Sequence, residues 1–344
     1  GLLLKEILYL RNITKRLVME IQKNFFEIVK NRLAPNLRLA DVVSEILDVG
    51  TDSAYRRIRG EKELSLSELS RLSRYFNISI DSILNLESDN IMFKYTPLDL
   101  RDMDNYYTYM DNLSTLIESV SKSKEKEMYF MALDIPLPHF TPFLELTFFK
   151  IYTWFQSVND LQITYDKFVE NLDKDRLLVY YNKIRDSYKQ VPSTEVWTNN
   201  TIEPILRLLD YYADMNCFSK KETLYLICHQ LLQLINELEN MTKSESKEYA
   251  SKESFFRLYL SPVDIMNDFM ITKRDGINVT SIKLYTINGI FTSNDYFCSE
   301  VEKWMKDTIT KSLFLSGASA KERFKFFQHL KNKVNNLLDK FEKL

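Results

Sequence analysis

The 344-residue sequence predicts a mostly α-helical protein made of two domains. Apolar residues recur at helical spacing along most of the chain, and only 6 glycines are present, too few for a fold built from strands and tight turns. After residue 255 the pattern changes to short alternating runs separated by Asp275-Gly276 and Asn288-Gly289, which is typical of hairpins. We therefore expect an N-terminal all-α domain over residues 1–90 and a larger, predominantly helical α+β domain over residues 91–344, with a small antiparallel sheet.

Composition narrows the class of protein but identifies no partner. The 45% hydrophobic and 27% charged residues describe an ordinary globular chain with an ample core, and the net charge is −2. Three widely spaced cysteines, Cys217, Cys228 and Cys298, suit a reducing compartment. No apolar run approaches the ~18 residues of a membrane span, and Leu2-Leu3-Leu4 is followed at once by charged residues, unlike a secretory signal. We expect a cytoplasmic protein that does not contact membranes.

Residues 2–34 have the pattern of helix, with apolar bursts over 2–10 and 17–33, and Pro35 ends the pattern. The second burst has the spacing of a first helix that packs under the segment that follows it. The first burst leaves two interpretations open: an added helix on the domain, or a dimerisation or inter-domain contact.

The next segment predicts two helices joined by a tight turn. An apolar stripe marks a helix from Leu39 to about Asp48, and a short cationic helix follows over residues 51–60. Asp52 or Ser53 can cap its N-terminus, and Gly60 is placed for the left-handed residue just past its end. Three residues form its apolar back (Ala54, Tyr55 and Ile58), and the opposite side carries Ser53 and Arg56, flanked by Asp52 and Arg57.

Two further helices are expected downstream. Ser65 and Glu68 form a capping-box pattern before an apolar stripe that runs to Phe76. Asn77 ends this helix, and Ser79 can cap a last short helix before the polar joint at 85–98, where we place the domain boundary. This order of elements is that of a helix-turn-helix domain, whose second helix enters the major groove of DNA.

Residues 23–86 resemble the helix-turn-helix domains of the phage-repressor-like, xenobiotic-response-element (XRE) family, and the runs DSAYRRIRGEKELSLSEL and NISIDSIL resemble the version found in regulators of Bacteroidetes. The resemblance implies a five-helix fold that binds double-stranded DNA, usually as a homodimer on a two-fold operator. It implies base contacts by Asp52, Ser53, Arg56 and Arg57. It implies phosphate contacts by Thr51, Arg59 and Lys62. The family commonly has glycine where this chain has Asp48, a departure that could shift the turn by one residue.

The charge of this region is local rather than general. Residues 1–88 hold 14 Lys and Arg against 12 Asp and Glu, a net of +2. We therefore expect modest non-specific affinity for DNA and a dependence on dimerisation for tight binding. The alternative interpretation of the arginines is an ordinary solvated helix face.

In the second domain, helices are expected over residues 99–120, 144–158, 164–190, 201–240, 295–310 and 321–341. Strands are expected over residues 128–135, 255–260, 265–271 and 279–287. Pro192 to Trp197 has the composition of a turn, and residues 239–254 form the most polar segment and are expected to be an exposed loop. Ser319 and Glu322 form another capping-box pattern before the last helix.

The sequence contains no recognisable catalytic, cofactor or metal motif. The three histidines, His139, His229 and His329, lie 90 and 100 residues apart, and none has a Cys or His at metal-ligand spacing. Phosphate-loop, dinucleotide-binding, nucleophile-elbow and zinc-protease patterns do not occur. Cys228 and His229 are adjacent on a helix, so their side chains diverge by about 100°. We expect no enzymatic activity, no cofactor and no metal.

Together these features predict a sequence-specific DNA-binding transcription regulator whose larger domain dimerises or responds to an effector ligand or protein. Two alternatives remain open. In one, the helix-turn-helix is a protein-interaction module on a signalling or enzymatic domain, and Arg56 and Arg57 are paired with residues such as Glu61 or Asp52. In the other, the chain is a peptide-sensing helical regulator.

Overall fold

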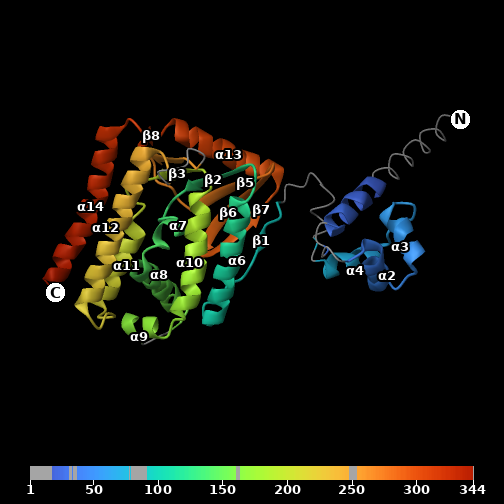
Figure 1. The fold of residues 1–344 in the computed structure, drawn as a ribbon, viewed down its shortest axis with the longest axis horizontal. Coiled ribbons are helices and arrows are strands. Elements are labelled where there is room, and N and C mark those ends of the chain that lie inside the picture. The colour runs from blue at the N-terminus through green and yellow to red at the C-terminus, as the bar shows by residue number, and fades with distance from the viewer. Residues whose placement is uncertain are drawn as a thin grey trace. The chain divides into compact units, whose positions relative to one another are not determined.

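The computed structural model describes residues 18–30, 33, 37–76, 78, 91–159, 163–247 and 254–343. The chain divides into two compact units, Gly1–Met92 and Phe93–Leu344, and each is described by itself (Figure 1). Two sequence expectations, the apolar burst over residues 2–10 and the helix capped by Ser79, lie outside the described residues.

Among the described residues of the N-terminal unit, the regular secondary structure is all helix. Its elements are a helix over residues 18–30, α2 (Leu39–Leu47), α3 (Thr51–Ile58) and α4 (Leu66–Tyr75). Each helix contributes to one small core, in which Phe25, Val43, Ala54 and Leu72 are buried. Fully burying such an apolar side chain contributes roughly 1.5–3 kcal/mol, so a core of this size depends on every helix being present.

The ends of α3 and α4 test the predicted caps. The capping box of α4 is confirmed, because Ser65 Oγ accepts from the Glu68 amide at 3.2 Å and Glu68 Oε2 accepts from the Ser65 amide at 3.0 Å. Gly60 has φ +78° just past the end of α3, also as predicted. The predicted N-cap of α3 is wrong: the chain leaves the turn extended at Gly50, so Asp52 already lies in the first helical turn.

The turn between α2 and α3 has Asp48, and not a glycine, at its left-handed position. Asp48 adopts φ 55° and ψ 53°, the left-handed conformation in which glycine is at ease, and its amide donates to the carbonyl of Glu45. Aspartate is one of the few non-glycine residues that tolerate this region. The substitution at Asp48 therefore need not shift the turn.

The second unit contains both helices and strands. Its helices are α6 (Met103–Ser121), α7 (Leu137–Phe140), α8 (Leu144–Gln156), α9 (Tyr165–Glu170), α10 (Lys174–Lys189), α11 (Glu203–Asp214), α12 (Lys221–Ser244), α13 (Asp295–Thr310) and α14 (Ala320–Glu342). Its strands are β1 (Lys94–Tyr95), β2 (Lys126–Met131), β3 (Ser193–Trp197), β4 (Phe256–Leu260), β5 (Phe269–Arg274), β6 (Ile277–Tyr285), β7 (Asn288–Thr292) and β8 (Leu313–Phe314).

These strands form one mixed sheet in the order β1-β7-β6-β5-β2-β3-β4-β8. The neighbours β2, β3 and β4 run parallel, and the remaining pairs are antiparallel. The expected small antiparallel sheet is therefore wrong: the described residues are 58% helix and 14% strand, and the sheet has eight strands, which makes the protein α+β. Parallel pairing needs long crossover connections, which α7–α10 and α11–α12 supply here.

The central strand β3 was mistaken for a turn because its sequence is half polar. All five of its residues are buried, since both faces of the sheet are covered. On one face Val196 packs in a cluster with Val301 and Met305 of α13. Glu195 and Trp197 alternate with Val196 and so point to the other face, where most of the helices lie. Strands covered on both faces are usually apolar, and Ser193-Thr194-Glu195 breaks that pattern.

Three smaller expectations for this unit are also wrong. Helix α12 continues to Ser244 and Lys247 beyond it is buried, so the described part of residues 239–254 is not an exposed loop. Ser319 makes no side-chain cap bond at the start of α14. Asn288-Gly289 begins strand β7 instead of forming a turn.

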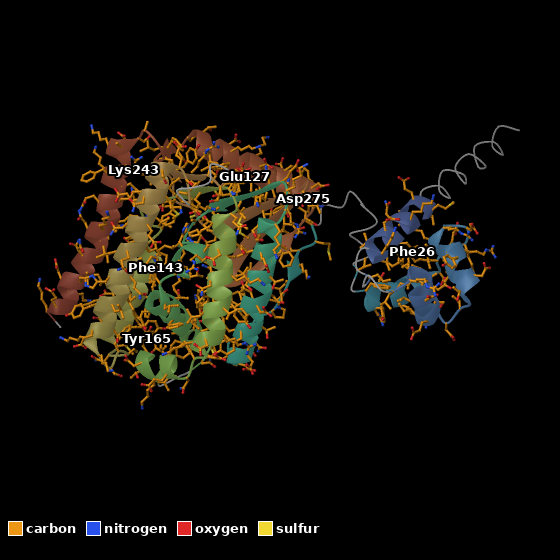
Figure 2. All side chains as sticks on the ribbon, in the orientation of Figure 1. Phe26, Glu127, Phe143, Tyr165, Lys243 and Asp275 are labelled. Carbon is orange, nitrogen blue, oxygen red and sulfur yellow. The ribbon has the colours of Figure 1, made fainter. Side chains whose placement is uncertain are left out.

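The second unit has a large aromatic interior. Phe149, Tyr152 and Trp197 are fully buried, and Figure 2 shows Phe143 and Tyr165 inside this unit and Phe26 inside the N-terminal one, each almost fully buried. Among the described residues, no helix has the length and apolarity needed to cross a membrane.

Candidate nucleic-acid interface

Helix α3 has one continuous exposed face. Its members are Thr51, Asp52, Tyr55, Arg56 and Arg59, the last of these at the C-cap. Successive residues turn by about 100° in a helix, so these five side chains cover one arc of less than half the circumference. Ala54 and Arg57 are buried on the opposite arc, where Ser53 and Ile58 are partly covered.

This face is rotated by about one residue from the one that the sequence predicted. Asp52 and Arg56 lie on the exposed face as expected, whereas Ser53 and Arg57 turn inward. Tyr55, assigned to the core, is 44% exposed. The apolar residues alone gave the wrong rotation because a charged side chain, Arg57, occupies a core-facing position.

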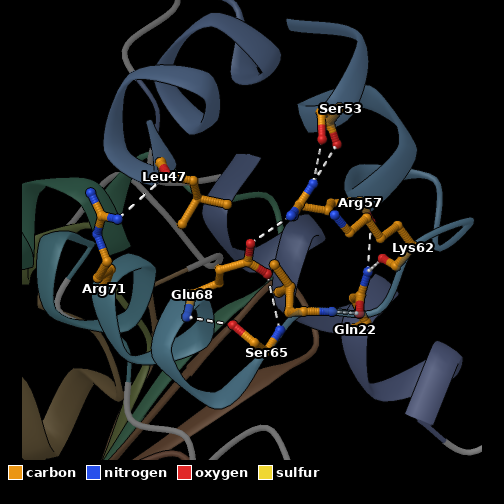
Figure 3. Close-up of polar contacts among 9 residues, drawn as sticks. Gln22, Leu47, Ser53, Arg57, Lys62, Ser65, Glu68 and Arg71 are labelled. Atoms are coloured by element: carbon orange, nitrogen blue, oxygen red, sulfur yellow. Dashed lines mark hydrogen bonds and ion pairs between the residues drawn. The ribbon is translucent and has the colours of Figure 1, made fainter. Parts of the chain in front are cut away.

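Arg57 is buried because it joins α3 to α4. Its Nη2 lies 2.5 Å from Glu68 Oε1, and its Nη1 donates to Ser53 Oγ at 2.6 Å and to the Ser53 carbonyl at 3.1 Å (Figure 3). The hydrogen bond and charge of Arg57 hold the pKa of Glu68 below its usual value. The same carboxylate closes the capping box of α4, so one side chain fixes both helix ends. Arg57 therefore positions α3 from behind.

Gln22 fixes the loop that follows α3. Its Nε2 donates to the carbonyls of Arg57 at 2.7 Å and Lys62 at 2.8 Å, and its Oε1 accepts from the Leu64 amide at 2.9 Å (Figure 3). The side chain is 6% exposed. Sequence analysis missed Gln22, although a signal exists: it shares the helical stripe of Phe25, Phe26 and Val29, all buried, so a polar residue stands at a core position.

The residues expected to hold phosphate are all exposed. They are Thr51, Arg59 and Lys62. Glu61 lies 3.9 Å from Arg56 Nε and 3.1 Å from Arg59 Nε, and the two arginine side chains remain 54% and 58% exposed. Exposed pairs of this kind contribute only about 0–1 kcal/mol, so an incoming phosphate or base can compete with Glu61 for either guanidinium.

Residues 25–103 match the family model of the BetR domain. This is a family of helix-turn-helix-like DNA-binding domains. The match takes in α2, α3 and α4 and ends at the start of α6, so it concerns the N-terminal unit and leaves most of the second unit unassigned. It indicates a DNA-binding regulatory domain with DNA as its partner. No curated protein and no solved structure was found to match the chain.

The described part of the second unit can also be compared with the requirements of a metal site and of a reactive thiol. Its described residues contain no group of three or more His, Cys, Asp or Glu side chains placed to hold a metal ion. Cys228 is buried, and this burial raises the pKa of its thiol to about 12, which makes it a poor nucleophile.

Proposed function

We propose that the chain is a sequence-specific transcription regulator of the XRE-like kind that inserts α3 into the major groove of DNA. The BetR match supports a DNA-binding role for the N-terminal unit. The observation that carries the finer proposal is the exposed face of α3, on which Tyr55, Arg56 and Arg59 stand clear of the core. Behind that face, Arg57 and Gln22 hold the helix in place.

The exposed face suggests a role for each side chain. Arg56 can donate two hydrogen bonds to O6 and N7 of guanine, and Asp52 can accept from the amino group of cytosine. Thr51, Arg59 and Lys62 are placed to hold phosphates, contacts that set register without specifying sequence. Tyr55, which the sequence placed in the core, is exposed on the same face and would also contact DNA. We withdraw Ser53 and Arg57 as base contacts, because their hydrogen bonds are made within the protein.

A homodimer is part of the proposal. The net charge of +2 over residues 1–88 gives a single domain little electrostatic attraction to DNA, so two copies on a two-fold operator would supply the missing affinity. Their α3 helices would then lie one DNA turn apart, ~34 Å. An effector that favoured a different separation would weaken binding, because a ligand shifts only an equilibrium whose states it binds unequally.

One observation favours the alternative of a protein-interaction module. Both exposed arginines of α3 face Glu61, and Arg57 is paired with Glu68, as that alternative requires. The ion pair between Arg57 and Glu68 lies inside the domain and is compatible with either function. The Glu61 contacts are exposed and weak, so they do not block DNA.

The test is selection from a pool of random duplex DNA over a series of salt concentrations. The wild-type chain should enrich a two-fold-symmetric site. Arg56→Ala should relax one base position in each half-site at a cost of about 1–3 kcal/mol, and Lys62→Ala should weaken all sequences alike and lower the salt slope by about 1. The control is Arg74→Ala, an exposed arginine in the last turn of α4.

The outcomes separate the two functions. Binding without enrichment would mean phosphate contact only. Absence of binding at low salt would refute the DNA-binding proposal and favour a protein partner for the same face. Equal effects of Arg56→Ala and Arg74→Ala would refute the assignment of α3 as the reading helix.

A further inference from the structure

A pocket opens in the second unit beside α7, α10 and α12. Its volume is about 40 Å³, and its polar lining comes from His139, Arg185, Tyr188, Glu237 and Lys247, with Lys189 beside them. A water molecule needs roughly 10–15 Å³ of such space, so the pocket has room for a few waters or for one carboxylate or phosphate group. Neither the BetR match nor the proposed DNA-binding function accounts for it.

Two residues of the lining, His139 and Tyr188, are hydrogen-bonded to a buried carboxylate that lies outside the lining. Glu195 is 0% exposed, and it accepts from Tyr188 Oη at 2.6 Å and from Trp197 Nε1 at 2.8 Å. His139 Nε2 lies 2.8 Å from Glu195 Oε1. Burial opposes ionisation, but His139 and the donors outweigh it and hold the pKa of Glu195 below its usual value.

The ionised carboxylate of Glu195 determines which ring nitrogen of His139 remains without a hydrogen-bond partner. A carboxylate only accepts hydrogen bonds, so the hydrogen of His139 that it binds must be on Nε2. The described residues offer no hydrogen-bond partner to the other ring nitrogen, Nδ1, although His139 is 95% buried and lines the pocket. In the neutral imidazole this nitrogen is an acceptor, so a water molecule bound by the ligand can donate to it.

Lys247 is a buried amine without a carboxylate partner. It is 6% exposed, its Nζ donates to the carbonyls of Tyr188 and Val191, and it lies 3.3 Å from the centre of the Tyr188 ring. The part of the chain that the structure describes places no acidic side chain within ion-pair distance of it. Burial lowers the pKa of Lys247 well below its usual value, and only the charge of Glu195 opposes this. Burial therefore favours the neutral amine, and a negative charge placed beside Lys247 would favour its charged form.

Other charged groups also line the pocket. Arg185 and Lys189 of α10 lie in the lining, and among the described residues the ion-pair partner of Arg185 is its exposed neighbour Asp186, at 2.8 Å. Glu237 is the acidic residue of the lining, and burial raises its pKa, which disfavours its charged form. Apart from His139, the described lining therefore holds three basic side chains, Arg185, Lys189 and Lys247, and one acidic side chain, Glu237.

From this geometry we propose that the pocket binds a small oxyanion, the carboxylate or phosphate group of an effector. The anion would lie beside Lys247, where the described residues place no carboxylate within ion-pair distance, and Arg185 would contact it from the solvent side. The hydrogen bond to Glu195 would keep the His139 ring in its position in the pocket lining. Because the ligand's charge must be desolvated to enter, binding depends on both basic residues together.

The test is titration calorimetry of the full chain with inorganic phosphate and, separately, with acetate, at constant ionic strength maintained with chloride. Saturable binding of either probe at one site supports the proposal, and the tighter probe identifies the ligand group. Arg185→Gln should weaken binding about tenfold, and Lys247→Met should abolish it. The matched control is Lys243→Met, because Lys243 is an exposed lysine of α12 close in sequence to Lys247 (Figure 2).

If Lys247→Met does not fold, as circular dichroism would show, Arg185→Gln still decides, because Arg185 is only partly buried and is not part of the core. No saturable heat with either probe would overturn the proposal. Equal affinity in the wild type and Arg185→Gln would overturn it too, since the anion would then bind elsewhere. DNA binding plays no part in this measurement, so its result is independent of the proposed function.

Discussion

The two units of the chain hold a buried charge in different ways. In the N-terminal unit, Arg57 is buried but its partner Glu68 keeps 19% of its side chain exposed, and the core around them is small. In the second unit, Glu195 is fully buried beneath a large aromatic core and is bound by three side chains. Water can reach one carboxylate and not the other. Removing a partner should therefore cost more in the second unit, because more groups are left unpaired there and they are more deeply buried.

The largest effect is expected for Glu195→Leu. The substitution leaves three buried groups, the His139 ring, the Tyr188 hydroxyl and the Trp197 indole N–H, without their acceptor. We expect the free energy of unfolding to fall by about 3–5 kcal/mol. Urea unfolding followed by tryptophan fluorescence measures it, because all three tryptophans, Trp154, Trp197 and Trp304, lie in this unit.

The control for this prediction is Glu300→Leu, which changes an exposed glutamate of α13 in the same way. It should alter the free energy of unfolding by no more than about 0.5 kcal/mol. A loss below about 1 kcal/mol in Glu195→Leu would show that the buried cluster relaxes or admits water, and the contrast between the two units would then disappear.

A smaller effect, about 1–3 kcal/mol, is expected for Arg57→Met in the N-terminal unit. Methionine keeps the apolar stem but leaves Ser53 and Glu68 without their donor, and the partial exposure of Glu68 limits the cost. Its neighbour Arg56 is more than half exposed, so Arg56→Met should leave stability within about 0.5 kcal/mol and impair DNA binding instead. Comparing the two variants therefore separates the loss of the hydrogen bonds that position α3 from the loss of a contact between α3 and DNA.

Hydrogen exchange of peptides from α3 and α4 is the suitable measurement, because this unit contains no tryptophan. Arg57→Met should speed exchange in both helices, and Arg56→Met should not. If Arg56→Met destabilised the helices and Arg57→Met affected only DNA binding, the inward and outward faces of α3 would have to be exchanged.

The same contrast explains what the sequence could predict. Three predictions depend on residues within one turn of each other and are confirmed: the order of the described helices of the N-terminal unit, the capping box at Ser65 and the glycine at position 60. Which side of α3 is exposed depends on the ion pair between Arg57 and Glu68, which is 11 residues away on another helix. No local pattern contains that information.

Strand β3 was missed for the same reason. Its glutamate is acceptable in a central strand only because His139 and Tyr188, 56 and 7 residues away, bind it. Without knowledge of those partners, Ser193-Thr194-Glu195 after a proline has the composition of a turn. In both cases a sequence pattern fails at a buried polar residue with a distant partner: Arg57, which joins α3 to α4, and Glu195, which binds two residues of the pocket lining.

The smallest expected effect is the pH dependence of the stability that the Arg57–Glu68 ion pair contributes. We call this pair the Arg57–Glu68 clamp. The pKa of Glu68 is lower in the folded chain than its ordinary value of 4.5, so folding favours the ionised form. The clamp then contributes its full stability above pH 4.5 and loses it as the pH falls through the folded pKa, because the unfolded chain binds the proton more readily. Protection of α3 and α4 against hydrogen exchange, corrected for the intrinsic rates, should decline below pH 4.5.

Glu68→Gln provides the comparison for this decline. Glutamine can keep a hydrogen bond to Arg57 and to the Ser65 amide but does not titrate. The variant should be less stable than the wild type at pH 7, and the difference should narrow as the pH falls. A difference that stayed constant down to acidic pH would show that charge contributes nothing to the clamp, and that the hydrogen bonds of Arg57 alone hold α3 against α4.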